Sequence, residues 1–422
     1  MKNNKYILIS FISLMVFGVP WLVNNYPKSA NFIDGLFTYV NESYALVFMR
    51  NSITVNQLQD KYDSVKNAKQ KIRILIAPGH EPGYGGAEYS NLKERELNVE
   101  VSKYLKDFFT RDNHYEVIIT RNNNSWDSEI QKYFTDNWNE IISFTKKNKE
   151  DMIHLVNTGS IVKVVDGVKH NAAAANVALR LFGINKWVNE NKIDIAIHIH
   201  FNDYPRRNSS IQGDYSGFSI YVPEKQYSNS TTTKIIADAV MKRLSKYNAI
   251  SNMPKENSGV TEDQDLIAIG TFNTLDAPSM LIEYGYIYET QFADVKSREM
   301  ILKDLAFQTY LGVQDFFDAP DNPAIAYDTV MLPHLWKDSF DIKNFDRGDV
   351  LSLQTALTVE GFYPGEGKTK NDCPITGKFG PCTIQALSNF QKKYGINDEK
   401  GMVGNKTINI LNTTYSPSLR QI

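Results

Sequence analysis

Short apolar runs alternate with amphipathic stretches through the middle of the chain. The runs are rich in β-branched residues, and several end in Gly, Pro or a polar residue, as buried strands do. They are Ile72–Ala77, Val117–Thr120, Ile193–Phe201, Phe218–Val222 and Met280–Glu283. Between them, helical spacing predicts helices at 97–108, 173–188, 235–244 and 301–317. Strands that alternate with helices predict an α/β fold, a mostly parallel sheet with helices on both faces.

The N-terminal part follows a different pattern. Lys2 and Lys5 precede an apolar stretch, Tyr6–Val23, whose length is at the lower limit for spanning a bilayer. We therefore expect an exported chain in which residues 1–25 are a signal peptide or an N-terminal membrane anchor. No clear small-x-small cleavage site follows, which leaves both interpretations open. Residues 26–70 are mostly polar and predict a stalk or linker.

A domain boundary is expected around Pro320, in a segment of Pro, Asp, Asn and Ala. Before it we predict a catalytic domain at 71–318 with a long insertion at 122–168. A linker at 319–342 follows. The pattern then changes to short helices without a convincing strand, which predicts a small all-α three-helix domain at 343–415. A chain of 422 residues is too long for one compact core, in agreement with two domains.

Charge and cysteine content narrow the possible functions. The chain has 46 Lys and Arg against 48 Asp and Glu, a net charge of -2, which argues against nucleic acid as a partner. Its two cysteines, Cys373 and Cys382, are too few for a disulfide scaffold or a cysteine-built zinc module. Because both lie in one short loop of an exported chain, we expect them to form a disulfide rather than remain free thiols.

Polar residues at three strand ends carry the candidate chemistry. The first predicted strand is followed by His80, the third ends around His200, and a later one ends at Glu283. In an open α/β sheet, ligands lie beyond the carboxyl ends of the strands, so these side chains should meet at one rim. Glu94 falls on the apolar stripe of the next helix, where a carboxylate is costly unless it is paired or bound to a metal. Two histidines and carboxylates at one rim indicate an open catalytic zinc site.

His198 shares a strand face with His200, because residues two apart on a strand point the same way. Spacing therefore does not choose between them as ligands, although His200 is nearer the rim. We interpret His198 as a hydrogen-bonded core residue, with support of the metal ligands as the alternative.

Five motifs together resemble the zinc-dependent N-acetylmuramoyl-L-alanine amidase family. They stand in the family's order: Ile74–His80, Glu94–Asn98, Val117–Arg121, Ile197–Asn202 and Pro278–Gly285. The resemblance implies that His80, Glu94 and His200 bind zinc and that Glu283 is catalytic.

The chain departs from the family's pattern at two positions. Glu81 follows the first histidine where the family usually has Gly-Gly, and His198 replaces a usual serine. These departures affect substrate detail rather than the metal. Glu81, His198 and Asn202 are accordingly candidates for contacting substrate or supporting the ligands.

The C-terminal part resembles a three-helix peptidoglycan-binding module. The resemblance rests on motifs such as Asp346–Val350, Glu360–Tyr363 and Gly377–Gly380. An ordinary three-helix bundle would show the same apolar spacing, so wall binding is implied by the resemblance alone.

The resemblance implies a cell-wall hydrolase of the cell envelope, either membrane-anchored or secreted. It would hold one Zn²⁺ per chain and cleave the amide between N-acetylmuramic acid and L-alanine of peptidoglycan. A zinc-activated water would attack, and Glu283 would accept its proton. Peptidoglycan is the expected partner, and the membrane is a second partner if the N-terminal segment is kept. Two alternatives stay open: a catalytically inactive peptidoglycan-binding wall protein, and a zinc peptidase that cuts within the stem peptide.

Overall fold

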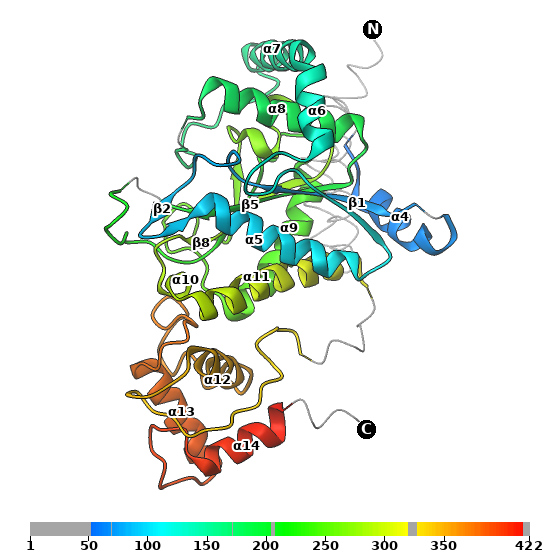
Figure 1. The fold of residues 1–422 in the computed structure, drawn as a ribbon. Helices are drawn as coiled ribbons and strands as arrows, with labels where there is room; N and C mark the ends of the chain where they lie inside the picture. Colours follow the sequence, from blue (N-terminus) through cyan, green and yellow to red (C-terminus); the bar gives the residue numbers. More distant parts are fainter. Residues whose placement is uncertain (1–51, 69, 171, 204–206, 320–326, 417–422) are drawn as a thin grey trace, which may run out of the picture.

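The computed structural model describes residues 52–68, 70–170, 172–203, 207–319 and 327–416 (Figure 1). Its centre is a six-stranded sheet in the order β4-β1-β5-β8-β6-β7. The strands are β1 Ile72–Pro78, β4 Tyr115–Ile119, β5 Ile195–Asn202, β6 Ser219–Pro223, β7 Val260–Asp263 and β8 Ser279–Tyr286. Strands β4, β1, β5 and β8 are parallel, whereas β6 is antiparallel to β8. The prediction of a mostly parallel α/β sheet is confirmed. The short strand β7 was not predicted, because its four residues are mostly polar.

Helices cover both faces of this sheet (Figure 1). One layer consists of α5 Glu94–Thr110, α9 Ser230–Tyr247 and α11 Val295–Phe316. The other consists of α6 Ser128–Asp136, α7 Trp138–Asn157, α8 Ala175–Glu190 and the 3₁₀ turns η3 Ile267–Ile269 and η4 Thr271–Asn273. A short hairpin, β2 Glu88–Tyr89 and β3 Leu92–Lys93, precedes α5, and α10 Thr290–Ala293 precedes α11.

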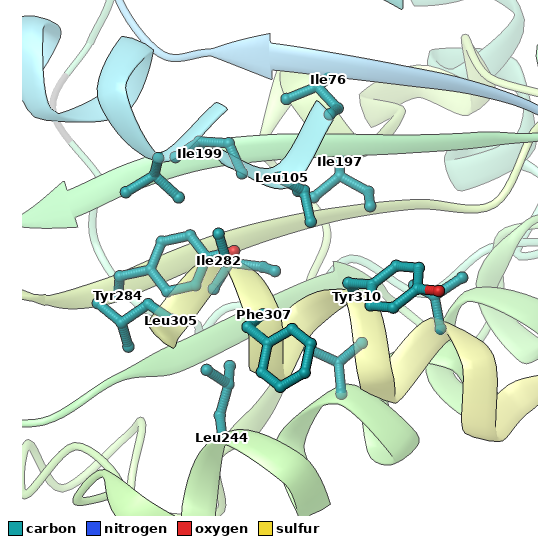
Figure 2. Packing of buried hydrophobic residues seen from close by; sticks show 14 of the residues in the cluster. Ile76, Leu105, Ile197, Ile199, Leu244, Ile282, Tyr284, Leu305, Phe307 and Tyr310 are labelled. Atoms are coloured by element: carbon teal, nitrogen blue, oxygen red, sulfur yellow. The ribbon is translucent and has the colours of Figure 1, made fainter. Parts of the chain in front are cut away.

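Successive side chains along each strand point to opposite faces of the sheet and therefore pack into different cores. The larger core packs strand residues against α5, α9 and α11 (Figure 2); it includes Ile197, Ile199, Ile282, Leu105, Leu244 and Phe307. Ala196 and Leu281 instead belong to clusters on the opposite face. Because side chains alternate, His200 shares the face of Ala196, and Glu283 shares the face of Leu281. The polar strand residues therefore lie on the α8 side of the sheet.

The stalk prediction for residues 26–70 is wrong in the part that the structure describes. Residues Val55–Ala68 form helix α4, which packs on the domain that contains the six-stranded sheet. Leu58 is fully buried, Tyr62 stacks on Phe317 with ring centroids 4.5 Å apart, and Lys61 forms an ion pair with Asp194. A helix that buries only a narrow stripe needs few apolar residues, so its sequence looks like that of a solvated segment.

The predicted signal peptide or membrane anchor at residues 1–25 lies outside the described residues. Among the ranges that the structure does describe, none of the helices is long and apolar enough to cross a membrane.

The insertion at 122–168 forms part of the helical layer. It contains α6 and α7, and Ile130, Phe134 and Ile141 pack with α8 residues in one buried cluster. The insertion thus thickens the side of the sheet that His200 and Glu283 face.

The C-terminal domain is helical, as predicted. It consists of α12 Arg347–Val359, α13 Pro381–Lys393 and α14 Asn405–Tyr415. The predicted linker at 319–342 is wrong for its later part, because Leu332, Trp336 and Phe340 are buried in the core of this domain. Trp336 is 1% exposed, and its indole Nε1 donates to the carbonyl of Asp349 at 3.0 Å.

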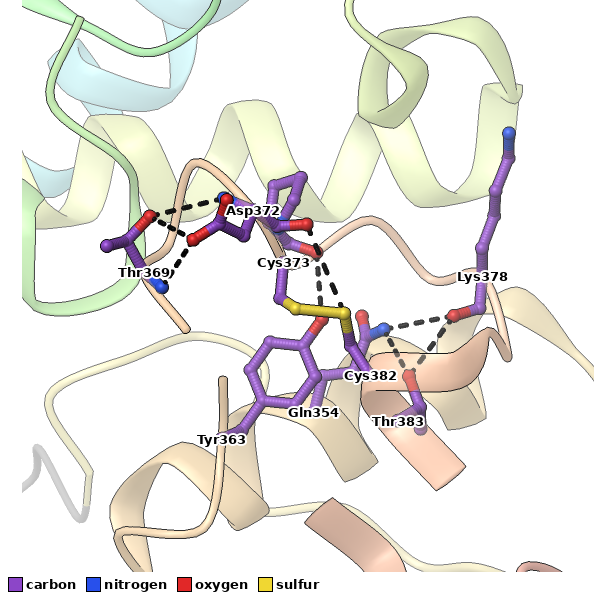
Figure 3. Close-up of a disulfide and its surroundings, with 9 residues drawn as sticks. Gln354, Tyr363, Thr369, Asp372, Cys373, Lys378, Cys382 and Thr383 are labelled. Carbon is purple, nitrogen blue, oxygen red and sulfur yellow. Dashed lines mark hydrogen bonds between the residues drawn. A yellow bond between two sulfur atoms is a disulfide. The ribbon is translucent and has the colours of Figure 1, made fainter. Parts of the chain in front are cut away.

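Cys373 and Cys382 form a disulfide in this domain, with Cα atoms 5.9 Å apart (Figure 3). The bridge joins a loop to the first turn of α13. Beside it, the buried Gln354 of α12 donates to the carbonyl of Lys378 and to Thr383 Oγ1. Cross-linking so short a loop stabilises a small domain chiefly by restricting the unfolded chain.

Candidate metal centre

Three strands bring the candidate residues to one rim of the sheet. His80 lies two residues beyond the end of β1, and the β1 residue Pro78 pairs with Ile199, next to His200 on β5. In turn, His200 pairs with Glu283 on β8. Because these strands are parallel, their carboxyl ends share one edge.

Glu94, the first residue of α5, faces the two histidines. Its Oε1 lies 2.7 Å from His80 Nε2 and 2.9 Å from His200 Nδ1. The backbone N–H groups of Ala87 and Phe201 also donate to the Glu94 carboxylate. One ligand atom from each of His80, Glu94 and His200 lies within 4.8 Å of the other two. The structure thus assembles three of the predicted site residues from three separate elements.

The backbone around the first histidine is strained and tightly packed. His80 has φ +69°, a left-handed conformation that costs a non-glycine residue about 1–3 kcal/mol. A Cβ on Gly79 would come within 2.1 Å of the His200 ring, so only glycine fits there. Gly86 has φ +86°, and a Cβ on it would lie 2.8 Å from the His80 ring. Glycine at these two positions therefore leaves room for the rings of His200 and His80.

The charges of the three groups are interdependent. Burial alone would raise the pKa of Glu94, but the charge of His80 and the hydrogen bond with His200 hold that pKa well below its usual range. Burial lowers the pKa of His200, and the charge of Glu94 opposes this shift. Both shifts favour an ionised carboxylate and a neutral imidazole, which are the forms that bind metals.

Glu283 lies beside this group but is not part of it. Its Oε2 atom is buried and has no hydrogen-bond partner among the described residues. Burial and the negative charges of Glu94 and Glu256 raise the pKa of Glu283 well above its usual range. A carboxyl group with a raised pKa and an unpartnered oxygen is suited to proton transfer.

The donor set fits a catalytic zinc ion. Two imidazole nitrogens and one carboxylate oxygen form the three-ligand arrangement that zinc hydrolases use. His80 Nε2 is buried and, although close to Glu94, lacks the alignment of a hydrogen bond. A buried polar atom without a hydrogen bond is expected where a ligand binds.

The comparison with known families agrees with this geometry. Residues 74–315, more than half of the chain, match the family model described as N-acetylmuramoyl-L-alanine amidase. The chain belongs to the N-acetylmuramoyl-L-alanine amidase family. It is therefore a peptidoglycan amidase, a hydrolase of the amide that joins N-acetylmuramic acid to L-alanine. Residues 346–411 match the model described as "Putative peptidoglycan binding domain". Peptidoglycan is thus substrate or partner, and the role of this amidase lies in the cell envelope, outside the cytoplasm.

Individual relatives cover mainly the catalytic part. A protein of Buchnera aphidicola subsp. Acyrthosiphon pisum (strain APS), named "Putative N-acetylmuramoyl-L-alanine amidase", is 22% identical over 257 residues, 59% of this chain and 95% of that relative. The CwlD amidase of Clostridioides difficile, solved in complex with the GerS lipoprotein, is 17% identical, with a TM-score of 0.38, and the match covers 59% of this chain and 99% of that one. The amidase Ami1 of Mycobacterium smegmatis is 12% identical, with a TM-score of 0.37 and the same two coverages. The family assignment rests on the match to the family model.

The remaining predicted residues lie around the group without joining it. His198 is 2% exposed, and burial and the charge of His200 lower its pKa to about 3, so it stays neutral in the core. Glu81 is 4% exposed, and its Oε1 lies 3.1 Å from Nη1 of Arg180. This ion pair connects the loop after β1 to helix α8. Direct contact between Glu81 and substrate is therefore not favoured by the structure.

Asn202 contacts Glu256, a residue that the sequence patterns did not predict as part of the site. The Nδ2 atom of Asn202 donates to Oε1 of Glu256 at 2.9 Å. Glu256 is fully buried and also accepts from the hydroxyl groups of Tyr221, Ser251 and Tyr286. Glu256 lies in a loop without any periodic pattern, so no local signal identifies it. This carboxylate fixes the side chain of Asn202 at the end of β5.

Proposed function

We propose that His80, Glu94 and His200 hold one zinc ion per chain and that Glu283 transfers protons during amide hydrolysis. The observation that carries the proposal is the group of three ligand atoms within 4.8 Å of one another, beside a buried carboxyl oxygen without a partner. When bound, zinc would supply Lewis acidity that acidifies water and polarises the amide carbonyl.

The protein's own groups account for the proton movements. Glu283 Oε2 accepts a proton from water as the new C–O bond forms at the amide carbon. The protonated carboxyl group then returns the proton to the nitrogen of L-alanine as the C–N bond breaks. A raised pKa makes Glu283 able to hold the proton between the two steps.

The two-domain arrangement suggests how the substrate is reached. We propose a catalytic domain at 71–318 and a wall-binding domain at 343–415 that keeps the enzyme on its polymer. Residues 1–25 would act as a signal peptide or as a membrane anchor, so that the enzyme works on the outer side of the membrane. Binding through one domain raises the local concentration of substrate for the other.

Digestion of purified peptidoglycan tests the proposal directly. We expect intact glycan strands and free stem peptides that begin with L-alanine, identified by mass. Fragments cut inside the stem would indicate a zinc peptidase, and no fragments would indicate a binding protein. Metal analysis of H80A and H200A variants completes the test, because a site with three protein ligands should lose most of its zinc when one is removed. Near-full zinc in both variants would contradict the ligand assignment.

A further inference from the structure

Arg121 is a buried cation whose hydrogen bonds all go to the backbone. It lies two residues beyond the end of β4 and is 3% exposed. Its guanidinium group donates to four carbonyl oxygens, those of Pro78, Gly79, Arg95 and Asn122. Burial lowers the pKa of Arg121 to about 10, so the group is still charged at neutral pH. Burying a charge is costly, so an arginine that is fully engaged by carbonyl groups indicates a specific role.

The carbonyl groups that Arg121 holds flank two of the three metal ligands. Gly79 immediately precedes His80, and Arg95 immediately follows Glu94. The Nε atom donates to Pro78 at 3.1 Å, and Nη2 donates both to Gly79 and, at 3.1 Å, to Arg95. One planar group therefore joins the loop after β1 to the first turn of α5.

The hydrogen bonds of Arg121 hold a loop that has no regular secondary structure to fix its conformation. His80 is in a left-handed conformation, and Gly83, Gly85 and Gly86 after it also have positive φ, so the loop has no regular structure of its own. Asn98 adds a second, longer bond to the Gly79 carbonyl, at 3.3 Å. The guanidinium group donates to carbonyl groups of both ligand-bearing segments at once, because its rigid fork presents several donors.

We propose that Arg121 is the positioning residue of the metal centre. It sets the distance between His80 and Glu94 through their neighbouring peptide groups, so zinc affinity depends on it although it touches neither the metal nor the substrate. This inference rests on the proposed zinc site.

The test compares zinc affinity in two lysine variants. R121K keeps the positive charge but removes the fork, so it isolates geometry from electrostatics. R243K is the matched control: Arg243 forms a two-pronged pair with Asp315 that joins α9 to α11, away from both ligand-bearing segments. Zinc affinity is measured by competition with a chelator of known affinity. We expect R121K to lose about 10- to 100-fold, as supporting groups around metal sites do, and R243K to stay within about 2-fold.

Cobalt substitution provides a readout that general destabilisation would not change. The visible absorption of bound Co²⁺ reports ligand geometry, so its bands should shift in R121K and stay unchanged in R243K. A folded R121K with wild-type zinc affinity and wild-type cobalt bands would overturn the inference. If R121K is unfolded without metal, folding on zinc addition with a weakened midpoint supports it, whereas a chain still unfolded at millimolar zinc overturns it. Failure of the wild-type protein to bind zinc would instead overturn the proposed function.

Discussion

Two buried glutamines in the core of the C-terminal domain differ in their hydrogen bonding from two buried groups at the rim of the catalytic domain. In the C-terminal domain, Gln354 and Gln391 are about 1% exposed, and each uses both the oxygen and the nitrogen of its amide in hydrogen bonds. At the rim of the catalytic domain, Glu283 Oε2 and His80 Nε2 are buried without a hydrogen bond in the described structure. Satisfied buried groups hold a fold together, whereas unsatisfied ones cost stability and are kept where a ligand uses them. We therefore expect a substitution at the rim to reduce activity, and a substitution of a buried glutamine in the C-terminal domain to reduce stability.

The largest effect is expected for E283Q. The amide has nearly the same shape as the carboxyl group but cannot take a proton from water, so the hydrolysis rate should fall by about 10²- to 10⁴-fold. Zinc content should not change, because Glu283 is outside the ligand group. Turnover on a muramoyl-peptide substrate and metal analysis of the same sample provide both readings. A variant that keeps more than a tenth of the activity would show that Glu283 is not the proton-transfer group.

For Q354L in the C-terminal domain, we expect a loss of stability without a loss of activity. Leucine leaves the N–H groups of Thr376 and Gly377 without their acceptor, the side-chain oxygen of Gln354. Each unsatisfied buried group costs about 1–3 kcal/mol, so this domain should lose about 2–6 kcal/mol. Its thermal transition should move down while hydrolysis of a small soluble substrate is unchanged. The exposed Gln385 is a matched control, since Q385L should change stability by less than about 0.5 kcal/mol. Equal effects of the two substitutions would refute the comparison.

Reduction of the disulfide should have a smaller effect on the same domain. Opening the loop between Cys373 and Cys382 should cost about 2–3 kcal/mol in the chain-entropy model. The melting temperature of the C-terminal domain and its binding to peptidoglycan should fall, while zinc content stays the same. The double variant C373S/C382S should not respond to reductant. If it responds as strongly as the wild type, the effect comes from elsewhere.

The smallest effect concerns Asp304 of α11, where the two domains meet. Its buried carboxyl group accepts hydrogen bonds from Thr329 Oγ1 and the N–H of Val330, and burial raises its pKa from the ordinary 3.8 to about 6. The folded state therefore keeps a proton that the unfolded chain releases. The resulting stabilisation is complete below about pH 3.8 and is lost as the pH rises through about 6.

The variant D304N retains an acceptor oxygen but does not titrate. Between pH 5 and 7 the wild type should lose about 1 kcal/mol more unfolding free energy than D304N. Urea unfolding at the two pH values measures this difference. Identical pH dependence of both proteins would mean that Asp304 does not titrate as described.

The sequence alone was enough to predict those candidate site residues whose positions follow from local periodicity. The ends of apolar runs identified His80, His200 and Glu283, and the helical stripe that continues through Leu97 identified Glu94 as inward-facing. The geometry that joins them depends on strand order and register, which a two-residue or 3.6-residue period does not contain.

Residues that act across long sequence separations could not be predicted in this way. Arg121 contacts Gly79, 42 positions away, and Glu256 contacts Asn202, 54 positions away. Helix α4 was missed for the same reason, because the partner of Tyr62 is Phe317. Such contacts appear only when the elements are placed together.

The placement of α4 determines from which side the enzyme can be held. Lys61 of α4 binds Asp194, immediately before β5, whereas His200 lies six residues along, roughly 20 Å away at the usual rise per strand residue. Ser52 and Ile53 contact Ser228 and Thr232 at the same distant edge, where β6 leads into α9. A tether joined before Ser52 would therefore be attached at the edge opposite His80, Glu94 and His200. A bulky, cross-linked polymer could then reach the rim without meeting the tether.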